Sequence, residues 1–546
     1  MMKQFLTFLT VAAIATLAAC SSPSGGNVPS PVKGTGASTA PTPAGGATLV
    51  GVGDSLTAGE QSDALLGTVT TSSISGYPGG AVFPGQVSGW WAIMYDCYSS
   101  TGSTCNHTPY TITAPLPLPS NASSAVLPLI NAPGLGTQLV LTTTGSLGAT
   151  QSGCSTFNVS AWGASTWTGT RASSNIGTAD LGVPGITMHE AVYMNGPYSG
   201  PPTQTSSGCG YATIPNDPTS GGLQSLVESE NQLFYPILGA YQAAYGSSLT
   251  QLNVAAGMKP KLVTVWLGAN DLLKFIFSAG TAPASDTPTQ MATDLTKIVK
   301  TLTATGAKVL VADLPTLLPT SGTGPPQFFP QAKVGEDLEA LGVPSAAAGA
   351  IVSYIGTQYG VTSGGYLTES GFLAIVETCE TPATEADCLT PQLDPTTAGS
   401  GLGAYYLTPA FAAEVQALNA GYNQAIDGVA EQFAAAAPGS VALVPINTFF
   451  QTAATSGVSV AGFPAPLTMQ FGGGLVTWDG LHPSNLGYAV IANEFIATAD
   501  TAATSGGLGM TIPELSALQL AQIASNDPYD PYVIKSGDPT SPFPLP

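Results

Sequence analysis

Three short segments, far apart in the sequence, hold polar residues whose types and spacing could do chemistry together. Ser55 lies in Gly-Asp-Ser-Leu near the start, Asn270 in Gly-Ala-Asn-Asp, and Asp479 and His482 in Asp-Gly-Leu-His-Pro near the end. A serine hydroxyl is a weak nucleophile at neutral pH, so it needs an imidazole to take its proton and a carboxylate to fix the tautomer of that imidazole. Of the three histidines, only His482 follows an aspartate by three residues. The spacing therefore predicts a triad of Ser55, His482 and Asp479.

The expected reaction of this triad is hydrolysis of a carboxylic ester. His482 takes the proton of Ser55 as the hydroxyl attacks the carbonyl, and later returns it to the departing alcohol. Water then repeats the cycle on the acyl-enzyme. The tetrahedral intermediate carries an oxyanion that needs preorganised hydrogen-bond donors.

With these motifs in this order, the chain resembles the SGNH (GDSL-type) hydrolase family, whose name lists Ser, Gly, Asn and His. The resemblance implies an oxyanion hole made by the backbone N–H of Ser55, the side-chain amide of Asn270 and the backbone N–H of a glycine. We assign that glycine to Gly185, with Gly182 as the second candidate. The resemblance also implies a three-layer α/β/α, flavodoxin-like fold with a mostly parallel sheet, and it calls for no cofactor and no metal.

The hydropathy pattern around the motifs independently predicts an α/β fold. Continuous apolar runs predict buried strands at 47–53, 262–267, 309–313 and 441–446. Apolar periodicity and capping residues predict helices at 288–303, 409–435, 484–499 and 512–525. Ser55 and Asn270 each follow the carboxyl end of a predicted strand, which is where an open α/β sheet binds its ligands.

The distances between the motifs predict one catalytic domain, 47–505, with large insertions and a C-terminal extension at 506–546. The expected insertions are 61–175, 190–258, 318–404 and 450–475. They are rich in Gly, Pro, Ser and Thr but also contain aromatic residues, including Trp90 and Trp91. Such aromatic side chains either form a binding rim around the site or pack in the interior, and the sequence leaves both interpretations open.

The first 20 residues are typical of a bacterial lipoprotein signal peptide. An apolar stretch too short to span a membrane ends in Leu17-Ala18-Ala19 before Cys20. Acylated Cys20 would then anchor the protein, and the Ser/Gly/Pro/Thr-rich residues 21–46 would act as a tether. The predicted location is the cell envelope, at the outer membrane or cell surface. An ordinary secretory signal with an incidental cysteine is the alternative.

The net charge of −21 excludes nucleic-acid binding as a sensible function, because such a surface repels phosphates. Without Cys20, six cysteines remain in a chain predicted to be exported, which favours disulfides over free thiols. Proximity in sequence suggests the pairs Cys97–Cys105, Cys379–Cys388 and Cys154–Cys209, among fifteen possible connectivities.

Other polar residues near the motifs have simpler expected roles. Asp54 and Asp271 are expected to hydrogen-bond loop backbone, as aspartates in turns commonly do. His189 and Glu190 lack the second histidine of a zinc motif, so a structural or rim role is expected. His107 belongs to no motif.

Two classes of function fit the sequence. The leading hypothesis is an ester hydrolase acting on an acylated glycan or a lipid, with an acyltransferase as a close relative, because the motifs describe only the reacting carbonyl. The alternative is a surface lipoprotein that binds glycan or lipid without turnover. A binding protein has no physical need for the serine, asparagine, aspartate and histidine together, which favours the enzyme.

Overall fold

The computed structural model describes slightly more than half of the chain. The described residues are 48–59, 67–68, 82–83, 88–108, 139–143, 156–158, 166–171, 179–194, 238, 241–277, 280, 287–318, 328–340, 344–368, 371–372, 406–469, 473–477 and 481–527. The predicted signal peptide with Cys20, the tether and Asp479 all lie outside these residues. Among the described residues, no helix is long and apolar enough to cross a membrane.

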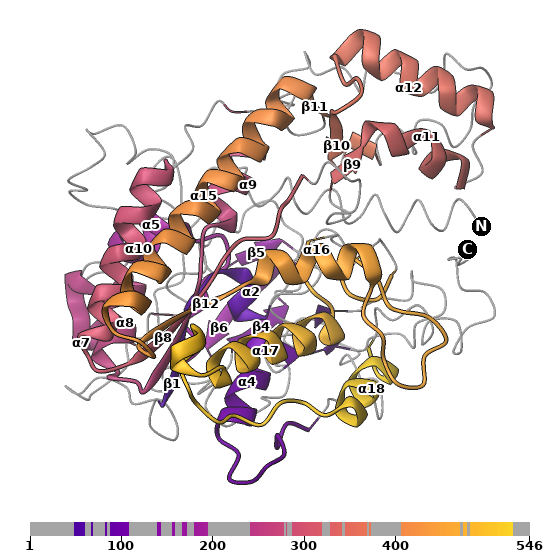
Figure 1. The fold of residues 1–546 in the computed structure, drawn as a ribbon. Coiled ribbons are helices and arrows are strands. Elements are labelled where there is room, and N and C mark those ends of the chain that lie inside the picture. The colour runs from indigo at the N-terminus through magenta and orange to yellow at the C-terminus, as the bar shows by residue number, and fades with distance from the viewer. Residues whose placement is uncertain are drawn as a thin grey trace.

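A parallel sheet forms the centre of the molecule (Figure 1). Its strands, in spatial order, are β1 (Leu49–Gly53), β7 (Leu262–Trp266), β8 (Lys308–Ala312) and β12 (Val441–Val444). All neighbouring pairs run parallel, which confirms the four predicted strands. β12 ends before Ile446 because Pro445 begins the next helix, α16 (Ile446–Ser456).

One further segment extends the sheet on the free side of β1. The N–H of Leu181 donates to the carbonyl of Gly51, and the N–H of Val183 donates to the carbonyl of Gly53, both at 3.0 Å. Residues 179–183 therefore run parallel to β1 and end at the same edge of the sheet. Counted across the sheet from residues 179–183 to β12, the five segments are the second, first, third, fourth and fifth in the sequence.

Helices cover both faces of this sheet, an arrangement compatible with a three-layer α/β/α fold. One face carries α5 (Met188–Tyr193), α8 (Gln251–Gly257), α10 (Pro288–Thr303) and α15 (Pro409–Ala436), and the other carries α4 (Trp90–Tyr98) and α17 (Asn485–Asp500). Thr287, Thr408 and Ser484 accept the N-terminal backbone N–H groups of α10, α15 and α17, respectively. These caps fix the helix starts close to the positions that the sequence predicts.

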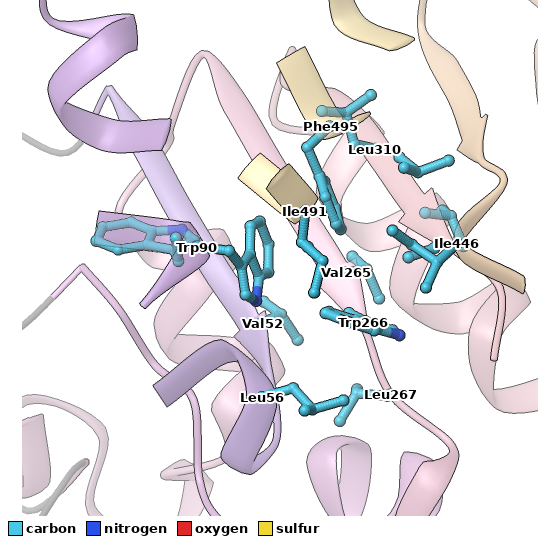
Figure 2. Packing of buried hydrophobic residues seen from close by; sticks show 14 of the residues in the cluster. Val52, Leu56, Trp90, Val265, Trp266, Leu267, Leu310, Ile446, Ile491 and Phe495 are labelled. Atoms are coloured by element: carbon cyan, nitrogen blue, oxygen red, sulfur yellow. The ribbon is translucent and has the colours of Figure 1, made fainter. Parts of the chain in front are cut away.

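The aromatic residues of α4 belong to the core. Trp90 stacks on Phe495 with ring centroids 4.0 Å apart, and it meets Trp266 edge-on at 5.8 Å (Figure 2). Trp90 and Trp91 are both fully buried. Of the two interpretations of these tryptophans, interior packing is therefore the right one. α4 lies within the expected insertion 61–175, yet it packs against β1 and α17.

The expected insertion 318–404, together with the strand that directly follows it, forms a second, smaller core. A short antiparallel sheet packs with two helices: β9 (Phe328–Pro330), β10 (Tyr366–Thr368), β11 (Tyr406–Leu407), α11 (Gln331–Ala340) and α12 (Ser345–Tyr359). Its apolar cluster is separate from the main core, with a stacked pair of Phe329 and Phe372 rings at 4.3 Å. Figure 1 shows this unit near one end of α15.

Smaller elements complete the described part of the chain. They are β2 (Gly67–Thr68), β3 (Val82–Phe83), β4 (Leu139–Thr143), β5 (Thr156–Asn158), β6 (Thr166–Arg171), α7 (Gln242–Tyr245), the 3₁₀ turns Gly246–Ser248 and Ala503–Ser505, and α18 (Ala517–Ser525). α18 begins at Ala517 rather than at Ile512, because Ser516 and Gln519 form a capping box there. Cys97 and Cys105 form the disulfide that proximity suggested, whereas Cys154, Cys209, Cys379 and Cys388 lie outside the described residues.

Candidate active site

Ser55 begins a short helix directly after the first strand. A single residue, Asp54, separates β1 from α2 (Ser55–Ala58), and its Oδ1 accepts the N–H of Leu56 at 3.0 Å as the N-cap of the helix. A Cβ at Gly53 would lie 1.9 Å from Oγ1 of Thr57, so only glycine fits this turn. The serine is thereby held at the carboxyl edge of the sheet, with 8% of its surface exposed.

Asn270 joins the loops that follow three neighbouring segments of the sheet. It lies in the first turn of α9 (Ala269–Phe277), after β7. Its Nδ2 donates to Oδ2 of Asp54 and to the carbonyl oxygen of Ile186, both at 3.2 Å. The amide of Asn270 therefore bridges the turn that carries Ser55 and the loop that follows residues 179–183.

The two glycines considered for the oxyanion hole differ in their surroundings. The N–H of Gly182 donates to Oδ1 of Asp180 at 3.0 Å, and a Cβ at Gly182 would lie 2.4 Å from the backbone nitrogen of Ala58. Gly185 has φ +77°, in the left-handed region that favours glycine, and directly precedes Ile186. The N–H of Gly182 is thus engaged by the side chain of Asp180, which favours Gly185 as the candidate donor.

Two further polar side chains brace these loops. Oδ2 of Asp271 accepts the N–H of Met188 at 3.1 Å. Like the bond that Asp54 accepts from the N–H of Leu56, this contact confirms that the aspartates beside the motifs bind backbone N–H groups. Gln251, in α8, is fully buried, and its Nε2 donates to the carbonyls of Gly53 at 2.7 Å and Leu181 at 2.6 Å. Sequence reasoning missed Gln251 because a lone glutamine in a helix belongs to no motif.

His482 lies in the loop that leads into α17. Its carbonyl accepts the N–H of Thr477 at 2.8 Å, and only 4% of the residue is exposed. In Figure 2, Ile491 lies nearer than Phe495 to the carboxyl end of β7, where the chain continues from Val265 to Leu267. Residue numbers in α17 therefore fall towards the carboxyl end of the strand, so the helix runs antiparallel to it. The start of α17, and with it His482, therefore belongs to the edge of the sheet from which Ser55 and Asn270 emerge. The predicted orienting acid, Asp479, lies outside the described residues.

The strongest electrostatic perturbation near these loops falls on Asp180. Burial raises the pKa of this carboxyl to about 8, and the hydrogen bond from the N–H of Gly182 opposes the rise only in part. Asp180 lies in the segment beside β1, five residues before the candidate oxyanion glycine, Gly185. At neutral pH this carboxyl is therefore largely protonated.

The other histidines take part in separate structural contacts. Nδ1 of His189 lies 2.8 Å from Oδ2 of Asp294, and both side chains are fully buried. Glu190 forms a capping box with Thr187 and an ion pair with Lys274 at 3.0 Å. His189 and Glu190 thus have the structural role that the sequence favours over a metal site.

His107 likewise pairs with an aspartate away from Ser55. Its Nδ1 lies 2.8 Å from Oδ2 of Asp96, on the helix that also carries Cys97. Within the described residues, no group of three or more His, Cys, Asp or Glu side chains could hold a metal ion.

The site thus consists of loops at one edge of a parallel sheet that present a serine, an asparagine amide, a glycine backbone and a histidine. Comparison of the chain with protein-family models, with curated proteins and with solved structures found no match to any of them.

Proposed function

We propose that the protein is a serine esterase of the SGNH type that hydrolyses carboxylic esters through an acyl-enzyme on Ser55. One observation carries the proposal: the Nδ2 of Asn270 bonds both to Asp54, beside the serine, and to the carbonyl of Ile186, beside Gly185. The three expected oxyanion donors therefore come from loops that are fastened to one another. A purely structural set of loops would not require a serine, an asparagine and a glycine in these neighbouring loops.

The order of the sheet supports the same proposal. The segments stand in the order 2-1-3-4-5, which is the order of flavodoxin-like sheets. In such sheets the ligand binds where the strand order reverses, between the first and third strands. Ser55 follows the first of these strands and Asn270 follows the third.

In the proposed mechanism, His482 removes the proton of Ser55 and later protonates the leaving alcohol, while Asp479 orients the imidazole. The N–H groups of Ser55 and Gly185 stabilise the oxyanion, together with the N–H of Asn270 that leaves the carbonyl of Ile186 when the substrate binds, while its other N–H stays on Asp54. A protein interior that excludes water around a nearly buried serine strengthens these hydrogen bonds. No metal or cofactor is needed for this sequence of steps.

We further propose that the enzyme is exported and anchored by an acylated Cys20, with residues 21–46 as the tether. The support is the sequence Leu17-Ala18-Ala19-Cys20 and the disulfide between Cys97 and Cys105, which is typical of oxidising compartments outside the cytosol. The ester substrate would then be an acylated glycan or a lipid of the cell envelope or its surroundings.

The proposal is tested by the hydrolysis of p-nitrophenyl esters, from acetyl to palmitoyl, by the full-length protein. We expect turnover that Ser55→Ala and His482→Ala abolish and that Asn270→Ala lowers by ~10²–10³-fold, the usual loss for one oxyanion donor. Thr57→Ser, on the same short helix, is the matched control and should retain most of the activity. Equal turnover by wild type and Ser55→Ala would refute the proposal.

A further inference from the structure

A polar cavity of about 730 Å³ lies beside α15, away from the residues of the candidate active site. One wall is a single face of α15, since its lining residues recur every three or four positions. The other walls come from the loop after β8, at Thr316, and from the first turn of α16, at Asn447. We call this cavity the α15 groove. Its lining residues on α15 are Gln416, Asn419, Ala420, Asn423, Gln424, Asp427, Gly428 and Glu431.

The chemistry of the lining restricts what the α15 groove can bind. Amides and a hydroxyl make up most of the wall, joined by the carboxylates of Asp427 and Glu431, and the described residues of the lining include no Lys, Arg or His. The carboxylates disfavour an anionic ligand. Among the described lining residues, only Ala420 and Gly428 lack a polar side chain, so a fatty acyl chain would find just these two small residues and the aliphatic stems of polar side chains. The amide N–H groups of the lining donate hydrogen bonds, and the amide and carboxylate oxygens accept them. A ligand hydroxyl also donates and accepts, so it can bond to both kinds of group.

Part of this lining is already used to hold the groove together. Asn423 accepts the N–H of Leu314 and donates to the carbonyl of the same residue, both at 2.8 Å. Oδ1 of Asn447 accepts the N–H of Thr316 at 3.1 Å. These two asparagines therefore fix the loop after β8 against α15 and α16 and act as scaffold.

Another part of the lining has hydrogen-bonding capacity left over. Asn419 is 3% exposed, and its Oδ1 accepts the N–H of Leu317 at 3.2 Å. Within the described part of the chain, its Nδ2 has no hydrogen-bond partner, and neither has Oδ1 of Asp427. A buried polar atom without a hydrogen-bond partner destabilises the folded protein, because it has lost its bonds to water. A ligand that offers an acceptor to Asn419 and a donor to Asp427 would remove this cost.

We propose that the α15 groove binds a neutral, hydroxyl-rich ligand, namely a sugar unit of a glycan. A sugar hydroxyl accepts from the Nδ2 of Asn419 while a second hydroxyl donates to the carboxylate of Asp427. A metal ion fits less well, because an amide N–H₂ repels a cation and because the described residues hold no group of three metal-ligating acidic, histidine or cysteine side chains.

One wall of the groove lies at the edge of the sheet that also carries Ser55. The loop with Thr316 follows β8, and the carboxyl ends of parallel strands share one edge. A glycan held in the groove can therefore extend along the same edge of the molecule. Binding in the groove does not depend on the esterase activity, so the two proposals can fail separately.

The test is isothermal titration of the full-length protein carrying Ser55→Ala with three neutral sugars: xylohexaose, cellohexaose and the hexamer of N-acetylglucosamine. Calcium chloride is titrated in a parallel experiment. We expect at least one of the sugars to bind, with affinity reduced at least tenfold by Asp427→Asn and by Asn419→Leu. Glu414→Gln and Gln432→Ala, at exposed positions of α15 outside the groove, are the matched controls and should leave the affinity unchanged.

The outcomes separate clearly. Asp427 is partly exposed, so Asp427→Asn keeps the test valid even if Asn419→Leu lowers the melting temperature. Failure of all three sugars to bind at millimolar concentration overturns the proposal. Sugar binding that neither groove variant weakens also overturns it, and so does binding of calcium alone, which would make the groove a cation site.

Discussion

The side-chain amide of Asn270 lies 3.2 Å from the carboxylate of Asp54, although the two residues are 216 positions apart in the sequence. Asp54 uses its other oxygen to cap the helix that begins at Ser55. A single carboxylate thus sets both the turn that carries the proposed nucleophile and the orientation of the proposed oxyanion donor. Asp54 is therefore a positioning residue of the proposed reaction, acting through Asn270 and Ser55.

The first prediction is that Asp54→Ala lowers kcat by about as much as Asn270→Ala, ~10²–10³-fold, and that the two changes are not additive. Without the carboxylate, the amide of Asn270 is free to turn away from the oxyanion. The measurement is a double-mutant cycle on p-nitrophenyl acetate hydrolysis. Loss of the cap also lowers stability by about 1 kcal/mol. If the double variant instead loses the product of the two single losses in kcat, Asp54 acts by another route.

A second prediction concerns Gln251, which ties the end of β1 to residues 179–183. Gln251→Met keeps the length of the side chain but leaves the carbonyls of Gly53 and Leu181 unpaired, each at a cost of about 1–3 kcal/mol. We expect a lower kcat with nearly unchanged KM, together with a lower melting temperature, because the change disturbs the donors of the transition state rather than substrate binding.

The matched control for Gln251→Met is Asn253→Ala on the same helix. Asn253 donates to the carbonyl of Ser248 at an exposed position and does not contact the active-site loops. It should lower stability slightly and leave kcat unchanged. If Gln251→Met lowers the melting temperature but not kcat, Gln251 supports the fold alone.

The sequence predicts the central sheet and its main helices well because their signals are local. Apolar runs mark the strands, and Thr or Ser before the helices supplies caps that do not depend on the rest of the fold. Gln251 could not be found in this way, since its bond to Gly53 spans 198 positions and depends on the tertiary fold. The same is true of Trp90, whose place in the core is decided by Trp266 and Phe495 rather than by its Gly- and Ser-rich neighbourhood.

A third prediction follows from the buried Asp180. Its pKa is 3.8 in an unfolded chain and about 8 in the folded protein, because burial disfavours the charged form. Between these two values the folded protein holds a proton that the unfolded chain has lost. The contribution of Asp180 to stability is therefore fully present below about pH 4 and is lost as the pH rises towards 8.

The measurement for Asp180 is the melting temperature of wild type and Asp180→Asn from pH 4 to 8. The variant cannot ionise and its Oδ1 can still accept the N–H of Gly182, so its melting temperature should fall less over this range, at about 2–4 °C for each kcal/mol. Glu339→Gln, at an exposed position of α11, should follow the wild-type curve. Parallel curves for wild type and Asp180→Asn would mean that the Asp180 carboxyl titrates alike in the folded and unfolded states.

The fourth prediction is that the disulfide between Cys97 and Cys105 stabilises the docking of the C-terminal helix. The bond closes a loop with a sequence separation of 8, for which chain entropy gives about 2–3 kcal/mol. The Nε2 of Gln519, in α18, donates to the carbonyls of Cys105 and His107 at 2.9 and 3.0 Å. Cys97→Ala/Cys105→Ala should therefore lower the melting temperature and speed amide hydrogen exchange in α18, while Gln519→Ala should reproduce only the faster exchange.

Peptide mapping of the unreduced protein must also recover the Cys97–Cys105 peptide pair. A different partner for Cys97 would contradict the pairing, and unchanged exchange in α18 would separate the disulfide from the helix.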